Sequence, residues 1–359
     1  MQRGYRITVT TMRWTCTDPA GHADAMPLRP SLLATLVAVI WGVNFVVIDL
    51  GLGDLPPTLF VALRFLAVLV PAIFLVPRPA ARWRDVLLVG TFMSLGQFGL
   101  LYTALALGMP AGLASLVLQA QVGLTVLFAA AALREVPTRR QVIGVLVGAA
   151  GLIVVGLGRS ESTPALAFVV TLAAASSWAV GNVVQRRSGG GAVGRSWTDG
   201  LSMTVWSALV VPVPMLGLAL WTDGPDAVGH ALTHLTPAPL LSTAYTAWLA
   251  SLVGYGIWNG LLARYPASAV VPFTMLVPPV GMAAAWLVLD EVPNVAEVTG
   301  GAVLLLGVAV TTGVPHRATA RRGVVVGGGV GGDVVRGDKR PAEESNGGPG
   351  RAETRRSLS

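Results

Sequence analysis

The sequence predicts an all-α integral membrane protein with ten transmembrane helices arranged as an inverted five-plus-five repeat. The chain has 359 residues, of which 53% are hydrophobic and 12% are charged, whereas a soluble domain carries about 25% charged residues. Ten apolar runs are long enough to cross a bilayer, and the loops between them alternate in charge. Part of the second half also repeats the first half at a fixed offset.

The ten apolar runs each approach the roughly 20 residues that one helix needs to cross the hydrocarbon core. Pro, Gly and charged residues separate them. Helices are expected because every backbone N–H and C=O group needs an internal partner in lipid. The expected spans are residues 31–52, 58–76, 86–107, 111–133, 142–157 (a short one), 164–184, 201–221, 240–262, 267–289 and 295–313.

Arginine is concentrated in alternate loops. One set of loops holds Arg78, Arg82, Arg84, Arg134, Arg139, Arg140, Arg186, Arg187, Arg195 and Arg264. The other set holds one arginine, Arg159, together with Asp49, Asp54, Asp223, Asp226, Asp290 and Glu291. The positive-inside rule therefore predicts an inner (plasma) membrane protein with both termini in the cytoplasm. The net charge of +7 reflects these loops and the tails, so no nucleic-acid partner is expected.

The two ends of the chain differ from the apolar body. Residues 1–27 form a polar tail without a signal-peptide pattern, and Met26 looks like the natural start of translation. Residues 316–359 are basic and rich in Gly, which favours disorder. Residues 28–158 and 159–315 are expected to form the two five-helix units.

The repeat is clearest in two loops. Glu135, Val136 and Pro137 recur 156 positions later as Glu291, Val292 and Pro293. The same offset places Pro110 on Pro266, Tyr102 on Trp258 and Gly144 on Gly300. Five helices are an odd number, so the two copies must cross the membrane in opposite directions. Inverted repeats are typical of secondary transporters, whose substrate site lies near the midplane between the halves.

Several stretches resemble one known family. They are WGVNFVVI (41–48), LRF (63–65), GMPAGLASLVLQAQ (108–121), LAAASSWAVGN (172–182), WSALVVPVP (206–214), VGYGIW (253–258) and LLARY (261–265). On these residues the chain is similar to the EamA family of the drug/metabolite transporter superfamily. The resemblance implies ten helices, an inverted repeat and efflux of small metabolites or drugs.

Arg64 is the charged residue that lies deepest in an expected helix. A charge in the membrane costs at least about 2.5–3.5 kcal/mol unless it snorkels, pairs or faces water. One interpretation is an interfacial arginine that snorkels from near the helix end. The other is a cavity arginine whose guanidinium holds a substrate carboxylate.

Polar amides and aromatic residues make up the other candidates for a substrate chamber. The amides are Asn44, Gln97, Gln119, Gln121, Asn182 and Asn259, and the aromatic residues are Trp41, Tyr102, Trp178, Tyr255 and Trp258. The alternatives are helix-to-helix hydrogen bonds for the amides and interfacial or lipid contact for the rings. Gln119 and Gln121 point about 200° apart on a regular helix, so at most one is expected to face the chamber.

Enzymatic chemistry is not expected. The histidines His22, His230, His234 and His316 lie in tails or in one loop, and Cys16 is the only cysteine. No metal site, cofactor or catalytic residue is therefore predicted. The amides and aromatic rings favour a small zwitterion as substrate, and the family resemblance implies the outward direction. The favoured function is thus export of small amino-acid-like metabolites, such as cysteine or O-acetylserine. The alternatives are multidrug efflux and a membrane protein that senses or interacts without transport. The expected partners are a small-molecule substrate and the lipid bilayer. Gly144-x-x-x-Gly148 and Gly300-Gly301 are interpreted as sites of close helix packing, with a homodimer face as the alternative.

Overall fold

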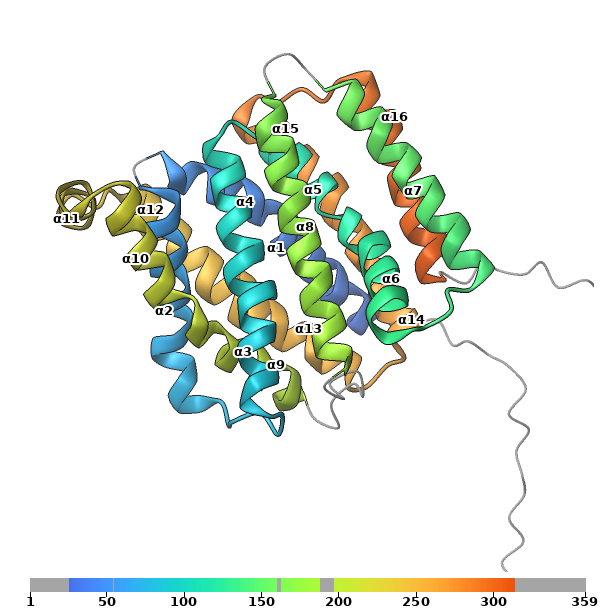
Figure 1. Cartoon of the computed structure of the whole chain (residues 1–359), viewed down its shortest axis with the longest axis horizontal. Coiled ribbons are helices and arrows are strands. Elements are labelled where there is room, and N and C mark those ends of the chain that lie inside the picture. Colours follow the sequence, from blue (N-terminus) through green and yellow to red (C-terminus); the bar gives the residue numbers. More distant parts are fainter. Residues whose placement is uncertain (1–25, 54, 160–162, 188–196, 314–359) are drawn as a thin grey trace, which may run out of the picture. The chain divides into compact units, whose positions relative to one another are not determined.

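A computed structural model describes residues 26–53, 55–159, 163–187 and 197–313 (Figure 1). This part of the chain is helical, and ten of its helices are long and apolar enough to cross a membrane. Each end of these spans lies within three residues of the boundary expected from the sequence. The hypotheses on Met26 as the start and on disorder of residues 316–359 concern segments that lie mostly or wholly outside the described residues.

The first five spans contain straight helices and two interrupted ones. They are α1 (Leu28–Leu52), α2 (Pro57–Leu75), a third span made of α3 (Trp83–Val89), a π-helical segment (Gly90–Gly96) and α4 (Gln97–Ala106), a fourth made of α5 (Ala111–Val117) and α6 (Ala120–Leu133), and α7 (Arg139–Leu157). The fifth span is three residues longer than expected because Thr138 caps it.

The second five spans follow a similar plan. They are α8 (Ala165–Gln185), a seventh span made of α9 (Trp197–Ser207), a 3-10 turn (Ala208–Val210) and α10 (Pro212–Thr222), an eighth made of α12 (Pro237–Ala244), a π-helical segment (Tyr245–Val253) and α13 (Gly254–Leu262), a ninth made of α14 (Ala267–Val270), a 3-10 segment (Val271–Leu276) and α15 (Val277–Leu289), and α16 (Val295–Thr312). The loop after α10 carries an additional short helix, α11 (Pro225–Thr233), which the sequence analysis did not anticipate.

The two Glu-Val-Pro loops have the same local structure. Each follows a helix whose C-cap residue adopts a left-handed conformation, at Arg134 (φ 55°) and at Asp290 (φ 57°). Each precedes a helix closed by a capping box, formed by Thr138 with Gln141 and by Asn294 with Glu297. The 156-residue offset is therefore visible in the backbone as well as in the sequence.

Helices α7 and α16 pack backbone to backbone through glycine. A side chain at Gly151 would lie 2.4 Å from the backbone N of Leu304, and one at Gly307 would lie 2.3 Å from the backbone N of Gly148. Gly144 faces Thr311 of α16 in the same way. The interpretation of Gly144 and Gly148 as a close helix-packing face is confirmed, and the partner of that face is a helix of the same chain.

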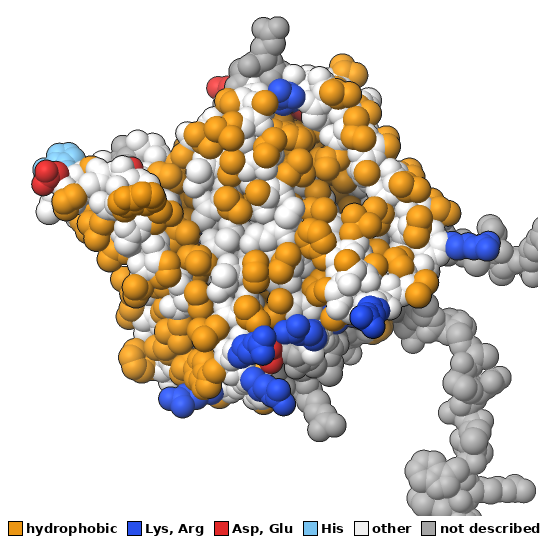
Figure 2. Space-filling model, viewed as in Figure 1, with side chains coloured by type: hydrophobic (Ala, Val, Ile, Leu, Met, Phe, Trp, Pro, Cys, Tyr) orange, Lys and Arg blue, Asp and Glu red, His pale blue; other side chains and the backbone are white. Residues whose placement is uncertain are grey.

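The outer surface of the described helices suits a bilayer. Phe74, Leu157 and Trp221 are each more than 80% exposed, and hydrophobic side chains cover the flanks of the helices in Figure 2. The α2–α3, α6–α7 and α13–α14 loops lie at the lower end in Figure 1. Most of the Lys and Arg side chains visible in Figure 2 gather along that end. We call it the arginine-rich end.

Candidate functional site

A cavity of about 460 Å³ lies between the two halves of the helical body. Helices α1, α2, α4, α6, α8, α13 and α16 contribute to its wall. The structure brings ten of the twelve residues that the sequence singled out to this cavity: Trp41, Asn44, Arg64, Gln97, Gln119, Gln121, Trp178, Asn182, Tyr255 and Trp258. Residues scattered over more than 200 positions of sequence thus share one chamber.

Arg64 lies in the wall of this cavity and is 3% exposed, so it does not snorkel to the interface. Its Nη1 group donates to Tyr102 Oη at 3.1 Å, and its Nη2 group donates to Ser251 Oγ at 3.2 Å. Its Nε atom is buried without a hydrogen-bond partner. None of the described carboxylates forms an ion pair with it. The guanidinium is therefore a buried cation without a countercharge in this part of the chain.

Two residues near Arg64 were not anticipated. The guanidinium carbon lies 4.1 Å from the ring centroid of Phe98, at cation–π distance. Ser251 lies in the π-helical segment of the eighth span, where its hydroxyl also donates to the carbonyl of Thr246, five residues earlier. If the eighth span were a regular helix with 3.6 residues per turn, Ser251 would lie on a different face of the helix from the one that meets Arg64. The π-helical segment shifts the register and brings Ser251 to Arg64. No pattern in the sequence marks that segment.

Tyr102 occupies a different place from the one expected. It is fully buried, does not line the cavity, and packs edge-on against Phe60 with 5.1 Å between ring centroids. Its hydroxyl accepts the hydrogen bond from Arg64 on the side away from the cavity. Trp258, its counterpart in the repeat, does line the cavity. The two positions therefore differ in environment although they correspond in sequence.

One wall of the cavity is aromatic. The ring centroid of Trp41 lies 5.1 Å from that of Tyr255 and 5.3 Å from that of Trp258. The Trp41 indole N–H donates to the carbonyl of Ala250 at 3.0 Å, which fixes the orientation of the ring. A side chain at Gly254 would lie 2.8 Å from Trp41 Nε1, so glycine is required for this close approach.

Gln119 and Gln121 both face the cavity, and the expectation that at most one could do so was wrong. That expectation assumed a regular helix over residues 111–133. The helix is instead interrupted between Val117 and Ala120. The backbone N–H groups of residues 119, 121 and 122 donate to carbonyls three residues earlier, so the chain is wound more tightly there.

The remaining amides are placed at different depths. Asn182 donates to Gln121 Oε1 at 3.0 Å and to Thr125 Oγ1 at 3.2 Å, which links α8 to α6. Asn44 Oδ1 is buried without a hydrogen-bond partner. Asn259 lines a neighbouring cavity of about 210 Å³ rather than the central one. Tyr102 and Asn259 are thus the two candidates that the structure does not bring to the central wall.

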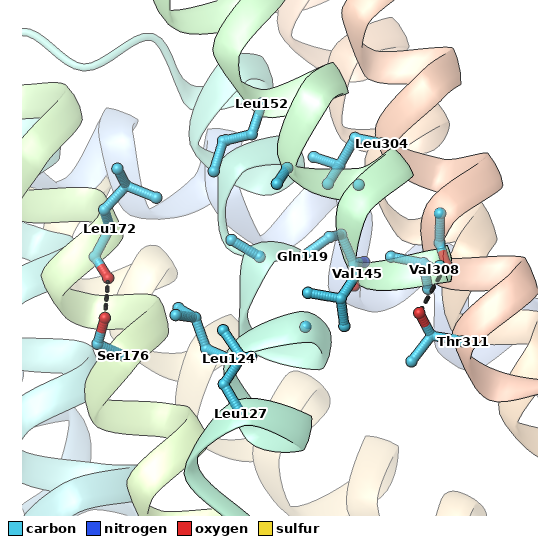
Figure 3. A pocket seen from close by; sticks show the side chains of 16 residues that line it. Gln119, Leu124, Leu127, Val145, Leu152, Leu172, Ser176, Leu304, Val308 and Thr311 are labelled. Atoms are coloured by element: carbon cyan, nitrogen blue, oxygen red, sulfur yellow. Dashed lines mark hydrogen bonds between the residues drawn. The ribbon is translucent and has the colours of Figure 1, made fainter. Parts of the chain in front are cut away.

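A separate pocket of about 270 Å³ lies between α6, α7, α8 and α16 (Figure 3). Its lining is almost entirely apolar, with Leu124, Leu152 and Leu304 among its residues. Gln119 and Val308 border both this pocket and the central cavity. This pocket therefore offers few polar groups to a hydrophilic ligand.

Comparison with known proteins identifies the family. The sequence profile of the EamA-like transporter family matches residues 28–157 and, separately, residues 165–313. The chain belongs to this family. The probable amino-acid metabolite efflux pump of Salmonella typhimurium (strain LT2) is 39% identical over 303 residues, covering 82% of this chain and 99% of the relative. The protein of the same description in Escherichia coli (strain K12) is 39% identical over 285 residues, covering 79% and 94%.

One solved crystal structure shares the fold, with a TM-score of 0.52 at 19% identity, and the match covers 80% of this chain and 99% of that chain. Membership of the EamA-like transporter family, together with ten candidate membrane-spanning helices in the described residues, makes this chain a multi-pass membrane transporter and not an enzyme. Among the described residues, no three His, Cys, Asp or Glu side chains come together in a way that could hold a metal ion.

Proposed function

We propose that this EamA-family protein is a secondary transporter that exports small zwitterionic amino acids, such as cysteine or O-acetylserine, across the plasma membrane. In this proposal the two halves are inverted copies, both termini lie in the cytoplasm, and the central cavity opens to each side in turn. The single observation that carries the proposal is Arg64, a cation without an ion-pair partner in the wall of an otherwise uncharged cavity.

The carboxylate of an amino acid is the group that Arg64 suits. A guanidinium offers a planar fork of N–H donors that can hold a carboxylate through two parallel hydrogen bonds. Both Nη groups are anchored by Tyr102 and Ser251, so the orientation of the fork is fixed before substrate arrives. Binding a carboxylate also supplies the countercharge that the buried arginine lacks.

The ammonium group of the same substrate suits the aromatic wall. Trp41, Tyr255 and Trp258 present π faces, which attract cations. The side-chain amides that also line the cavity, including Gln119 and Gln121, can donate hydrogen bonds to a small polar side chain or accept hydrogen bonds from it. A zwitterion therefore finds a complement for each of its charges.

Substrates with a large net charge fit the same cavity poorly. Removing an unpaired ion from water costs several kcal/mol, even after relaxation of the protein. The cavity offers one fixed cation and, among its lining residues, no carboxylate. Phosphorylated compounds and simple organic cations are thus disfavoured. The site does not determine the direction of transport, which depends on gradients. The outward direction is instead supported by the two relatives described as probable efflux pumps.

A counterflow experiment tests the proposal. Purified protein in liposomes loaded with unlabelled amino acid should accumulate labelled cysteine, O-acetylserine or another neutral amino acid from outside. Cells that overproduce the protein should release more of the same amino acid into the medium. Counterflow of bulky aromatic cations without any amino-acid counterflow would replace this proposal by drug efflux. Absence of flux for both classes would favour a protein that does not transport.

A further inference from the structure

At one end of the helical body, the second Glu-Val-Pro loop is attached to a neighbouring helix through its glutamate. Glu291 accepts hydrogen bonds from the backbone N–H groups of Ala111 at 2.9 Å and of Gly112 at 3.0 Å. It thereby ties the α15–α16 loop to the beginning of α5. Helices α5 and α15 are in close contact there, because a side chain at Gly112 would lie 3.1 Å from the Cα atom of Met282. This end lies opposite the arginine-rich end.

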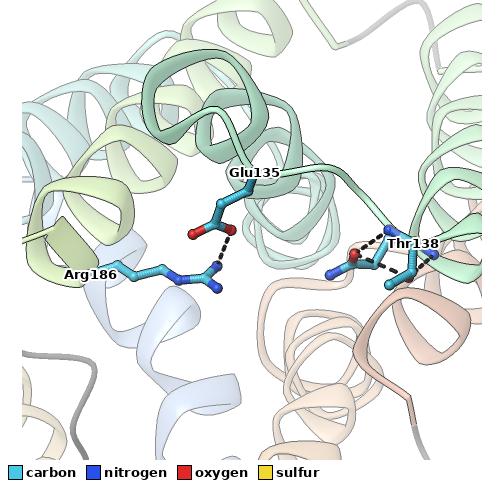
Figure 4. A network of polar contacts seen from close by, with 4 residues as sticks. Glu135, Thr138 and Arg186 are labelled. Carbon is cyan, nitrogen blue, oxygen red and sulfur yellow. Dashed lines mark hydrogen bonds and ion pairs between the residues drawn. The ribbon is translucent and has the colours of Figure 1, made fainter.

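The first Glu-Val-Pro loop has a different partner. Glu135 corresponds to Glu291 in the repeat, and the counterparts of Ala111 and Gly112 are Ala267 and Ser268. Glu135 does not bond to them. It forms an ion pair with Arg186 at 3.1 Å, and both side chains are about half exposed (Figure 4). An ion pair with this exposure contributes little stability, so it can be exchanged for another contact.

A cavity occupies the space where the counterpart of the α5–α15 contact would lie. It has a volume of about 390 Å³ and separates α6 from α14 and the 3-10 segment that follows. Thr125 and Val126 line it from one side, and Ser268 and Val271 line it from the other. It shares Gln121 and Asn182 with the central cavity. The chamber therefore continues toward the arginine-rich end, whereas the opposite end is held together by Glu291.

We infer that Glu291 and Glu135 are alternating latches of the transport cycle. In the state described here, Glu291 is bonded to Ala111 and Gly112 and the chamber extends toward the arginine-rich end. In the opposite state, Glu135 leaves Arg186 and accepts the N–H groups of Ala267 and Ser268, which draws α14 onto α6 and closes that end. Glu291 releases Ala111 and Gly112 in the same transition. Both glutamates are positioning residues, because neither lines the central cavity.

The chemistry of each latch suits a reversible contact. A carboxylate that accepts two backbone N–H groups makes strong, charge-assisted hydrogen bonds. Each pair of N–H groups also follows a proline, Pro110 or Pro266, at a point where a helix begins and has no internal acceptors for them. A closed latch therefore satisfies backbone donors, and an open latch leaves them to water. Both closed latches use the same kind of contact, a carboxylate with two backbone N–H groups.

This inference rests on the alternating access of the proposed function, and its test does not require the substrate to be known. Cys16 is the only cysteine and is first replaced by Cys16→Ser. Two reporters are then introduced separately. Val126→Cys lies in the open cavity at the arginine-rich end, and Ala285→Cys lies in the closed contact, where Ala285 is fully buried. A membrane-impermeant maleimide is applied to each side of sealed vesicles.

The two glutamates serve as matched variants. Glu291→Gln removes the charge and one acceptor, so the rate of labelling should rise about tenfold at Ala285→Cys and fall at Val126→Cys. Glu135→Gln weakens the opposite state and should shift both rates in the other direction. If Glu291→Gln does not insert, Glu135→Gln at its partly exposed position still decides the question. Equal rates in the variants and the parent, or shifts in the same direction for both glutamates, would overturn the latches.

Amino-acid counterflow separates this result from the proposed function. If labelling shifts as expected but no amino acid is transported, the latches stand and the proposed substrate class is wrong. If the parent protein transports amino acids and neither glutamate affects labelling, the substrate proposal stands and the latches are overturned.

Discussion

Arg64 and Tyr102 are joined by a hydrogen bond of 3.1 Å between the guanidinium Nη1 and the phenolic oxygen, 38 residues apart in sequence. The arginine faces the central cavity, whereas the tyrosine is fully buried behind it. The tyrosine therefore holds the arginine from the side away from the cavity. This relationship divides the candidate residues into those that line the cavity and those that position a lining residue from behind it.

Replacing Arg64 should impair transport of substrates that carry a carboxylate. Lysine keeps the charge but cannot form a planar fork, and its ammonium does not reach Tyr102 and Ser251 in the same way. We expect Arg64→Lys to raise the KM for a transported amino acid at least tenfold, and Arg64→Gln to abolish measurable counterflow. The amount of inserted protein should stay unchanged. Normal transport by both variants would remove Arg64 from the substrate site.

Tyr102→Phe tests the positioning role separately. It removes the hydroxyl that accepts from Arg64 and leaves the ring packed against Phe60. A hydrogen bond to a charged group contributes about 1.5–3 kcal/mol, and part of this loss should appear as a three- to tenfold rise in KM at an unchanged protein level. Tyr245→Phe is the matched control, because it loses a similar bond, from Tyr245 Oη to the carbonyl of Ile40 at 2.9 Å, away from Arg64. A similar rise in KM for both variants would contradict the assignment.

The sequence predicts the spans well because hydropathy is a local property. Each run of apolar residues must form a helix in lipid, so its ends can be located from composition alone. Most of the polar side chains of the chamber were also predicted, since polar residues in a membrane segment avoid lipid and collect in the interior. Asn44, Gln97 and Asn182 were found on this basis.

The missed features depend on irregular backbone. Gln119 joins Gln121 in the cavity because the helix is interrupted between Val117 and Ala120, and Ser251 reaches Arg64 from a π-helical segment. Both departures change which face a residue occupies, and neither is marked by proline at that point. Tyr102 and Asn259 lie away from the central wall because of the helices that pack against them. The hydrophobic periodicity of a sequence does not show which helices become neighbours.

The orientation in the membrane can be tested with reporter fusions. Fusions after Arg84, Arg140 and Arg264 should report a cytoplasmic location, and fusions after Asp226 and Asn294 an external one. The physical reason is the concentration of arginine in the first set of loops. The two Glu-Val-Pro loops would then lie on opposite sides of the membrane. Finding both on the same side would contradict the inverted repeat and, with it, the latches.

The contact between α7 and α16 gives a prediction about stability. Gly151→Ala places a methyl group 2.4 Å from the backbone N of Leu304 and 2.6 Å from the carbonyl of Gly300. Backbone atoms on a tightly packed helix cannot move aside as a flexible side chain would, so the helices must separate. We expect a loss of about 1–3 kcal/mol, measured as a lower Tm of the purified protein in detergent.

Gly217→Ala is the matched control for that measurement, because it also adds one methyl group to a membrane helix. Gly217 lies in α10, and a side chain there meets no atom within 4 Å. Alanine favours a helix over glycine by up to about 1 kcal/mol, so the Tm should stay the same or rise. If Gly151→Ala and Gly217→Ala shift the Tm equally, the α7–α16 contact is not closely packed in the membrane protein. If only Gly151→Ala lowers it, the repeated glycines hold together the two helices that end the two halves of the chain.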